Sequence, residues 1–250
     1  MNPPGSGSQK PAFDGSTDRP ASPCGNLPIR RCHLLTCLSF SPGNDTTMTS
    51  PIAAQHPSIV LASSSPFRRE LLSRLGIEFS SHSPDIDESA RPAETPEALV
   101  LRLAEGKARE VAKLNPEALI IGSDQVATID GRMLGKPGSH ERAVEQLMQA
   151  SGRRVSFLTS LCLFNSAKGA IQLAVETYHV VFRELTQDEV EHYLRKEQPY
   201  NCAGSFKSEG LGICLFQRME GDDPSSLIGL PLIRLVDMLR NEGIDILLSD

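Results

Sequence analysis

The stretch IVLASSSPFRRELL, residues 59–72, sets the frame of the fold. Its first four residues form a short apolar run, which is typical of a buried strand. Three serines follow, and Pro66 stands where a helix can begin, because the first helical position needs no N–H donor. Leu71, Leu72 and Leu75 give that helix an apolar stripe. The stretch therefore predicts a strand, a serine loop and a helix in direct succession.

Strand and helix patterns keep alternating beyond this point, and their order predicts an α/β protein. The run at 118–122 is continuous and apolar, as in a central strand that is buried on both faces. Because hairpin signals occur among the strands, a mixed, twisted sheet flanked by helices is expected rather than a purely parallel sheet. The other expected elements are a strand at 77–81, a helix after Thr95-Pro96, a turn at Asp130-Gly131, a helix from Ser139 to around Ala150, a hairpin of 155–164 with 171–182, a helix capped by Thr186 and Glu189, and a last helix at 227–240.

Residues 1–47 differ from the rest of the chain. They hold seven of the 18 prolines and five of the 19 glycines, and they show no helical or alternating apolar pattern. Such a segment buries too little apolar surface to offset its ordering entropy. We therefore expect a disordered N-terminal extension over 1–55 and a folded domain over 56–250. Met48 is a candidate initiator, which would make the first 47 residues an artefact of start-site choice. A genuine disordered tail is the alternative.

The composition narrows the classes of partner. The net charge is −6, which argues against nucleic-acid binding, since nucleic-acid binders usually present a basic face. A few converging Lys and Arg side chains can still hold a small anion on an acidic protein. No apolar run approaches the roughly 20 residues of a membrane span. None of the six cysteines forms a C-x-x-C pair, so we expect free thiols in a reducing, cytoplasmic setting and no structural zinc.

The serine loop is a candidate phosphate site. Backbone N–H groups at a helix start favour an anion, and Ser63 with its two neighbours lets a phosphate approach closely. Arg68 and Arg69 add positive charge, and arginine can grip phosphate oxygens with two N–H groups. An ordinary capped helix with two solvated arginines is the alternative for this segment taken alone.

Other polar groups strengthen the case for a ligand site. Asp124 and Gln125 belong to GSDQ, residues 122–125, which we place at the end of the best buried strand, where open α/β sheets bind ligands. An aspartate there is costly unless it binds a metal, accepts hydrogen bonds or acts as a base. Further candidates are Lys107, Lys136 in GKP, the acidic residues Asp85, Asp87 and Glu88, and the glycine-bounded loop 204–210.

At these residues the chain resembles the Maf family of nucleotide pyrophosphatases, from about Ile59 to Ile246. The resemblance implies a mixed α/β fold with a cleft, similar to that of inosine triphosphatases. It also implies hydrolysis of a nucleoside triphosphate between the α- and β-phosphates. The matching segments are ASSSPFRRELL at 62–72, DIDE at 85–88, GSDQ at 122–125, GKP at 135–137, AGSFKSEGLGI at 203–213 and EGDDPSSLIGLPL at 220–232.

The resemblance also implies roles for single residues. Asp124 would be the catalytic base, and Glu88 with Asp124 would hold a divalent metal ion, Mg²⁺ or Mn²⁺. Arg68, Lys107, Lys136 and Lys207 would contact phosphates, beside Ser63 and Arg69 of the serine loop. A homodimer is a further expectation. The chemistry fits these residue types, because a carboxylate can activate water while cations stabilise the charge on the phosphate oxygens.

Three departures from the commonest family pattern concern the base. Many family members have Arg, Thr and Gln where this chain has Phe67, Gln125 and Glu209. This combination resembles the branch that prefers 7-methyl-GTP. N7-methylation makes guanine cationic, so an aromatic face and a carboxylate both attract it, whereas arginine repels it. The alternative is that Phe67 packs on its own helix and Glu209 is solvated, outside any base pocket.

Other activities stay open at this stage. The chain can act on dTTP, UTP or a broader set of nucleotides, or it can be a phosphatase of other metabolites, which would release orthophosphate. A nucleotide-binding regulator of cell division without turnover is a different class, since family members have been linked to septum formation.

Overall fold

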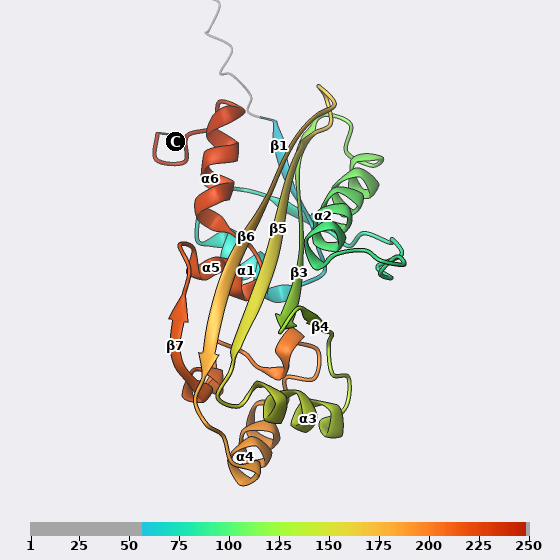
Figure 1. The fold of residues 1–250 in the computed structure, drawn as a ribbon. Helices are drawn as coiled ribbons and strands as arrows, with labels where there is room; N and C mark the ends of the chain where they lie inside the picture. The colour runs from blue at the N-terminus through green and yellow to red at the C-terminus, as the bar shows by residue number, and fades with distance from the viewer. Residues whose placement is uncertain (1–56, 249–250) are drawn as a thin grey trace, which may run out of the picture. The chain divides into compact units, whose positions relative to one another are not determined.

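The computed structural model describes residues 57–248, and these form a mixed α/β body (Figure 1). The predicted boundary between 55 and 56 and the candidate initiator Met48 lie outside the described residues. The seven-stranded sheet has the order β2-β1-β3-β5-β6-β7, with β4 paired to β3. The strands are β1 (Ser58–Ala62), β2 (Ser80–His82), β3 (Ala118–Ile129), β4 (Arg132–Leu134), β5 (Arg154–Asn165), β6 (Ala170–Phe182) and β7 (Phe216–Glu220).

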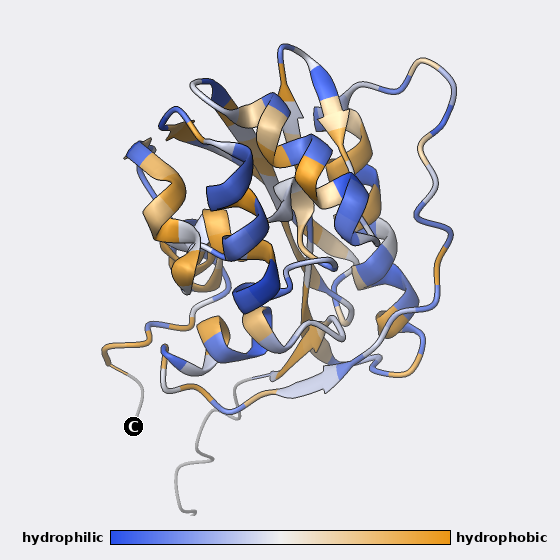
Figure 2. Cartoon of the chain, turned by 90° about the horizontal axis from the view of Figure 1, so that it is seen from below, coloured by the Kyte–Doolittle hydropathy of each residue, from blue (hydrophilic) through white to orange (hydrophobic). Residues whose placement is uncertain are grey.

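The helices surround this sheet. They are α1 (Pro66–Ser73), α2 (Pro96–Ala112), α3 (His140–Ala150), α4 (Gln187–Glu197), α5 (Pro224–Ile228) and α6 (Leu232–Asn241), with 3₁₀ turns η1 (Ala203–Ser205) and η2 (Leu211–Leu215). Residues 59 and 61 of β1 pack with α1 and α6, whereas residues 60 and 62 pack with α2. The two faces of the sheet are therefore covered by different helices, and α3 and α4 pack at one end of the long β5–β6 hairpin (Figure 1). Hydrophilic and hydrophobic residues alternate along the helices, as expected of amphipathic elements (Figure 2).

The prediction of a mixed sheet is confirmed. β1 is parallel to β2 and β3, while β3 is antiparallel to β4 and β5, and the pairs β5–β6 and β6–β7 are antiparallel. The sheet thus joins a parallel part, built by the first strands, to an antiparallel part, built by the long hairpin. No helix in the described range is long and apolar enough to cross a membrane.

The strand–loop–helix at 59–72 forms as predicted. Ser65 caps α1, because its side chain accepts a hydrogen bond from the backbone N–H of Arg68 at 3.4 Å. Pro66 occupies the first turn, and Leu71 and Leu72 are fully buried. Local sequence signals alone specify this element.

The prediction for residues 122–125 needs a correction. They do not end a strand, because β3 continues to Ile129. The parallel pairing with β1 stops at Leu61 opposite Ile121, and pairing with β4 begins only at Ala127. Residues 122–126 therefore have β5 on one side and no strand on the other. This gap in the sheet places the polar residues of β3 beside the serine loop that follows β1.

Two other predicted elements differ from the structure. The strand expected at 77–81 is instead β2 at Ser80–His82, because its hydrogen bonding with β1 begins only at Ser80. The helix expected at 227–240 is two helices, since Gly229 has a φ of 123° and Pro231 provides no N–H. The break turns the chain between α5 and α6.

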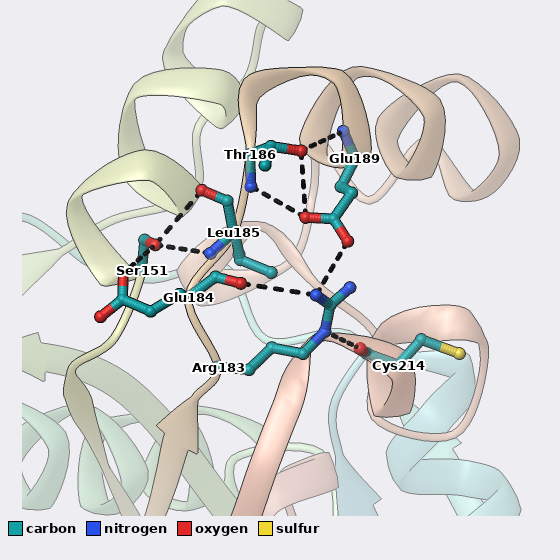
Figure 3. Close-up of polar contacts among 7 residues, drawn as sticks. All are labelled: Ser151, Arg183, Glu184, Leu185, Thr186, Glu189 and Cys214. Atoms are coloured by element: carbon teal, nitrogen blue, oxygen red, sulfur yellow. Dashed lines mark hydrogen bonds and ion pairs between the residues drawn. The ribbon is translucent and has the colours of Figure 1, made fainter.

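The helix cap predicted at Thr186 is confirmed (Figure 3). The side chain of Thr186 accepts from the N–H of Glu189, and Glu189 accepts from the N–H of Thr186 at 2.8 Å. Arg183 at the end of β6 donates to Glu189 and to the carbonyl of Cys214 (Figure 3). The end of the long hairpin, α4 and η2 are thereby joined.

Helix α2 lies unusually close to β3. Thr95 caps the helix, and Leu99, Leu103 and Val111 are buried as predicted. A Cβ on Gly122 would lie 2.2 Å from the carbonyl oxygen of Ala104. Only glycine permits this approach, which carries the next turn of α2 toward Asp124.

Candidate active site

A cavity of about 660 Å³ opens at the gap in the sheet. One side is formed by the serine loop, α1, α2 and β3. The other side is formed by the loop after β4 and by the segment before η2. The polar and aromatic side chains that line it include Ser63, Phe67, Arg68, Glu88, Lys107, Asp124, Gln125, Lys136, Ser208 and Glu209.

Lys107 is the central charge of the cavity. Lys107 is only 5% exposed. Its Nζ lies 2.6 Å from Oδ1 of Asp124 and 2.7 Å from Oε1 of Glu88. A buried ammonium needs such partners, because its lost hydration is otherwise uncompensated. The cluster of Glu88, Lys107 and Asp124, called here the acid–lysine cluster, thus holds two carboxylates at one point.

The two carboxylates differ in exposure. The side chain of Asp124 is 15% exposed, whereas that of Glu88 is 55% exposed. Desolvation raises the pKa of Glu88, but the hydrogen bond and charge of Lys107, helped by Lys136 and Arg68, outweigh it and leave the pKa below its usual value. Glu88 is therefore ionised at neutral pH. Oδ2 of Asp124 has no hydrogen-bond partner within residues 57–248.

Arg68 is fixed at one end and open at the other. Its Nε donates to the carbonyl of Gly229 at 2.8 Å, and Ser123 Oγ donates to the same oxygen at 2.8 Å. Desolvation lowers the pKa of the Arg68 guanidinium, while Asp124 and Glu88 oppose that shift. The terminal nitrogens of Arg68 have no partner in the described part of the chain, so they are available to an anion.

The serine loop has an internal support. Ser63 Oγ accepts from the N–H of Ser65 at 3.1 Å, and Ser81 Oγ donates to the Ser63 carbonyl at 2.8 Å. Ser63 lines the cavity and is buried, whereas Ser64 is exposed. The loop is thus held between β2 and the start of α1.

Gln125 presents one end to the cavity. Its Nε2 donates to the Ser226 carbonyl at 2.8 Å, to the Leu227 carbonyl at 3.0 Å and to Thr159 Oγ1 at 2.9 Å. Two carbonyls can only accept, so the amide orientation follows from its partners. The oxygen Oε1 is left without a partner among residues 57–248 and is the acceptor that Gln125 offers to a ligand.

Phe67 and Glu209 both line the cavity, and they come from different segments of the chain. Phe67 is half-buried at the start of α1, and Glu209 is exposed on the loop before η2. Ser208 Oγ donates to Glu209 Oε2 at 3.2 Å. Lys136, on the loop between β4 and α3, is exposed and lines the cavity as well.

Two predicted phosphate-binding residues lie outside the cavity lining. Arg69 directly follows Arg68 on α1 and is exposed. Because successive residues of an α-helix point about 100° apart, the two side chains leave the helix in different directions. Lys207 reaches away from the cavity, and its Nζ lies 3.3 Å from Oε1 and 3.1 Å from the carbonyl of Glu197. A carboxylate at the end of α4 thus already neutralises Lys207. A role for Arg69 and Lys207 in phosphate binding stays a prediction.

Sequence reasoning missed the apolar floor and the backbone partners of the site. Leu99, Leu103, Val126, Phe157, Phe206 and Leu227 line the cavity, although each has the sequence signature of a core residue. The carbonyl of Gly229, which anchors Arg68 and Ser123, has no side-chain signal at all. The only sequence indication of this carbonyl is that Gly229 belongs to the block at 220–232, one of the segments that resemble the family.

The donor set suits a divalent metal ion. Within residues 57–248 no three His, Cys, Asp or Glu side chains form a metal-binding group. Glu88 Oε1 and Asp124 Oδ1 both bind the ammonium of Lys107, so a metal ion would use their other oxygens. Mg²⁺ commonly uses one or two carboxylates together with substrate phosphates and water, so the predicted ligands are of the right chemical type, and metal binding stays a prediction.

The chain is an α/β protein whose cavity is lined by three cationic side chains, Arg68, Lys107 and Lys136, and three carboxylates, Glu88, Asp124 and Glu209. Residues 58–242 match the profile of a family described as Maf-like protein, and the chain belongs to this family.

Relatives of this chain share most of its length. A protein of Nitrosococcus oceani is 56% identical over 191 residues, which cover 76% of this chain and 96% of the relative. One of Pseudomonas syringae pv. tomato is 60% identical over 190 residues, 76% of this chain and 99% of the relative. One of Methylobacillus flagellatus is 56% identical over 191 residues, 76% of this chain and all of the relative. Each of the three is named 7-methyl-GTP pyrophosphatase.

Among solved structures, the Ham1 protein of Staphylococcus aureus is similar at a TM-score of 0.42 and 16% identity, covering 75% of this chain and 100% of that one. A likeness at this level carries no argument about function.

Proposed function

We propose that this protein hydrolyses 7-methyl-GTP to 7-methyl-GMP and pyrophosphate and so removes a modified nucleotide from the pool. The observation that carries the chemistry is the acid–lysine cluster, in which Lys107 joins Asp124 and Glu88 on the wall of the cavity. The relatives that are 56–60% identical over nearly their whole length support the substrate, since they carry that name.

The phosphates would lie between the serine loop and Lys136. The start of α1 offers backbone N–H groups, and Arg68 offers terminal nitrogens that are free to bind an anion. Lys136 has no ion-pair partner within the described residues, so its charge is available from the opposite side of the cavity. Two cations on opposite sides would hold an extended triphosphate across the cavity.

Asp124 would be the base. Oδ1 is bound to Lys107, which fixes the carboxylate, and Oδ2 has no partner in the described part of the chain. Water bound at Oδ2 would attack the α-phosphorus, its proton would pass to Asp124, and the bond from that phosphorus to the bridging oxygen would break to release pyrophosphate. Glu88 and Asp124 would hold Mg²⁺ or Mn²⁺, which when bound neutralises the phosphate oxygens and the leaving group.

The base would be recognised on the Phe67 and Glu209 sides. An aromatic face attracts the cationic ring of 7-methylguanine by about 0.5–2 kcal/mol, and the Glu209 carboxylate adds attraction of the same sign. Oε1 of Gln125 would accept a hydrogen bond from a base N–H, because its amide nitrogen is already occupied. Nucleoside triphosphates are cytoplasmic metabolites, so we propose a cytoplasmic location. A homodimer stays a prediction.

A panel of nucleotides tests this function. The purified full chain would be given 7-methyl-GTP, GTP, dTTP and UTP with Mg²⁺ or Mn²⁺, and pyrophosphate and orthophosphate would be measured separately. We expect pyrophosphate, with the highest kcat/KM for 7-methyl-GTP. Orthophosphate as the product would instead make the protein a phosphatase, and binding without either product would make it a nucleotide-binding regulator. A higher kcat/KM for dTTP or UTP would contradict the proposed substrate.

A further inference from the structure

The segment between β2 and α2 carries Glu88 to the cavity without regular secondary structure of its own. Residues 83–95 contain no helix or strand, and most of them are exposed. A carboxylate on such a segment would ordinarily sample many positions, because few backbone hydrogen bonds restrain it. Glu88 nevertheless lies 2.7 Å from Lys107. Besides this ion pair, other contacts join the segment to helix α2.

Arg102 of α2 supplies such contacts. Its Nε donates to Oε1 of Glu94 at 2.6 Å, and its Nη2 donates to Oε2 at 2.8 Å, so two N–H groups bind one carboxylate. The same Nη2 donates to the carbonyl of Ser89 at 2.9 Å. Arg102 thus binds the segment at two points, one of them directly after Glu88.

Glu94 extends the connection within the segment. Its Oε2 also accepts from the N–H of Arg91 at 2.9 Å, and its side chain is only 9% exposed. The hydrogen bond from Arg102, followed by that from the Arg91 backbone, lowers the pKa of Glu94 to about 2. The carboxylate is therefore ionised at neutral pH, as its ion pair with Arg102 at 2.6 Å requires.

An apolar contact completes the attachment. Cδ1 of Ile86 lies 3.4 Å from the position of a Cβ on Gly106, the residue before Lys107. Helix α2 therefore holds the segment on both sides of Glu88, through Gly106 on one side and Arg102 on the other. Since Lys107 belongs to the same helix, the two attachments set the distance between Glu88 and the ammonium group.

We propose that Arg102 is a positioning residue, which fixes Glu88 in the acid–lysine cluster by binding Glu94 and the Ser89 carbonyl. The kinetic part of this inference rests on the proposed function. Arg102 itself does not line the cavity and is not expected to touch the nucleotide.

The first test follows the segment without any nucleotide. Arg102→Lys keeps the charge but loses the paired N–H groups, so amide hydrogen exchange within 86–94 should become at least tenfold faster, while exchange in β3 and β5 stays unchanged. Arg109→Lys is the matched control, because Arg109 lies on the same helix and pairs with Glu105 at 2.7 Å. The informative amides are those of Arg91 and Glu94, which are hydrogen-bonded within the segment. Unchanged exchange at these two amides would overturn the proposal, whether or not the protein hydrolyses nucleotides.

The second test is a double-mutant cycle on kcat. Arg102→Lys should lower kcat by between about tenfold and 100-fold with a smaller effect on KM, since a displacement near 1 Å of a functional group has effects of that order. In a Glu88→Gln background the same change should cost less than about twofold, because the two residues act through one another. Equal losses in both backgrounds would show that Arg102 acts by another route.

The absence of pyrophosphate release from the wild type would refute the proposed function alone, and the hydrogen-exchange comparison would still decide the role of Arg102.

Discussion

The two sides of the cavity are built differently. On one side, which we call the α2 side, Arg68, Lys107 and Asp124 each have a named partner, and two of these residues are largely buried. On the other side, called the loop side, Lys136 and Glu209 are exposed, and Ser208 is the hydrogen-bond partner of Glu209. Preorganised charges suit a chemical step, whereas exposed side chains on loops can be exchanged without disturbing the core. We therefore expect the chemical step on the α2 side, and the choice of nucleotide on the loop side together with Phe67.

The largest expected effect is that of Asp124→Asn on the α2 side. The amide cannot take a proton from water, so kcat should fall by about 10²–10⁴-fold, the usual contribution of a general base. Pyrophosphate release and nucleotide binding would be measured on the same preparation. Binding should persist, and a kcat within threefold of wild type would remove Asp124 from the chemistry.

Lys107→Met should affect both activity and stability. The change leaves Asp124 and Glu88 facing each other without their shared cation, and a buried group that loses its partner costs about 1–3 kcal/mol. Urea unfolding would measure this loss. The control is Lys113→Met, whose lysine caps the same helix, is exposed and pairs with Glu110, and whose effect should stay within about 0.5 kcal/mol. Similar unfolding free energies for both variants would contradict the difference between buried and exposed charge.

Glu209→Gln on the loop side should change selectivity and leave the chemistry intact. Losing one negative charge near a cationic base should lower the preference for 7-methyl-GTP over UTP by about tenfold, or 1.4 kcal/mol, with kcat within threefold. The ratio of kcat/KM values measures it, and Phe67→Arg should act in the same direction. A large loss of kcat in Glu209→Gln would contradict the proposal that the loop side selects the nucleotide without taking part in the chemical step.

The smallest expected effect is that of Arg69→Ala. Because Arg69 lies outside the cavity lining, its removal should change KM by less than twofold, whereas Arg68→Ala should raise KM by at least tenfold. Titration of the initial rate with nucleotide distinguishes the two neighbouring arginines. Equal increases in KM would restore the sequence-based prediction that both bind phosphate.

Local patterns predicted much of the fold but only part of the site. Ser65, Pro66 and the leucines of α1 define their element through contacts within a few residues, which is why residues 59–72 were predictable. The position of Asp124 within a continuing strand was not, because it depends on where β1 ends beside β3. The residues before Asp124 do not indicate where the pairing of β3 with β1 stops.

The direction of Lys207 was unpredictable for a related reason. A lysine between glycines looks available to a phosphate, and only the fold brings the end of α4 close enough for Glu197 to bind it. Likewise, every residue has a backbone carbonyl, so the sequence gives no sign that Arg68 binds the carbonyl of Gly229. Residue types indicated which chemistry to expect, and tertiary packing determines which of the candidates line the cavity.

The parallel pairing of β1 has a consequence for the order of folding during synthesis. β1 pairs with β2, which begins at Ser80, but its other neighbour β3 begins only at Ala118, and β3 in turn pairs with β5 up to Asn165. Contacts of such sequence separation form late, because a long loop must close before they are made. We therefore expect the β1–β3 pairing to form only after the middle of the chain has been synthesised. The serine loop, which precedes β3 in the chain, would then acquire its final surroundings late in synthesis.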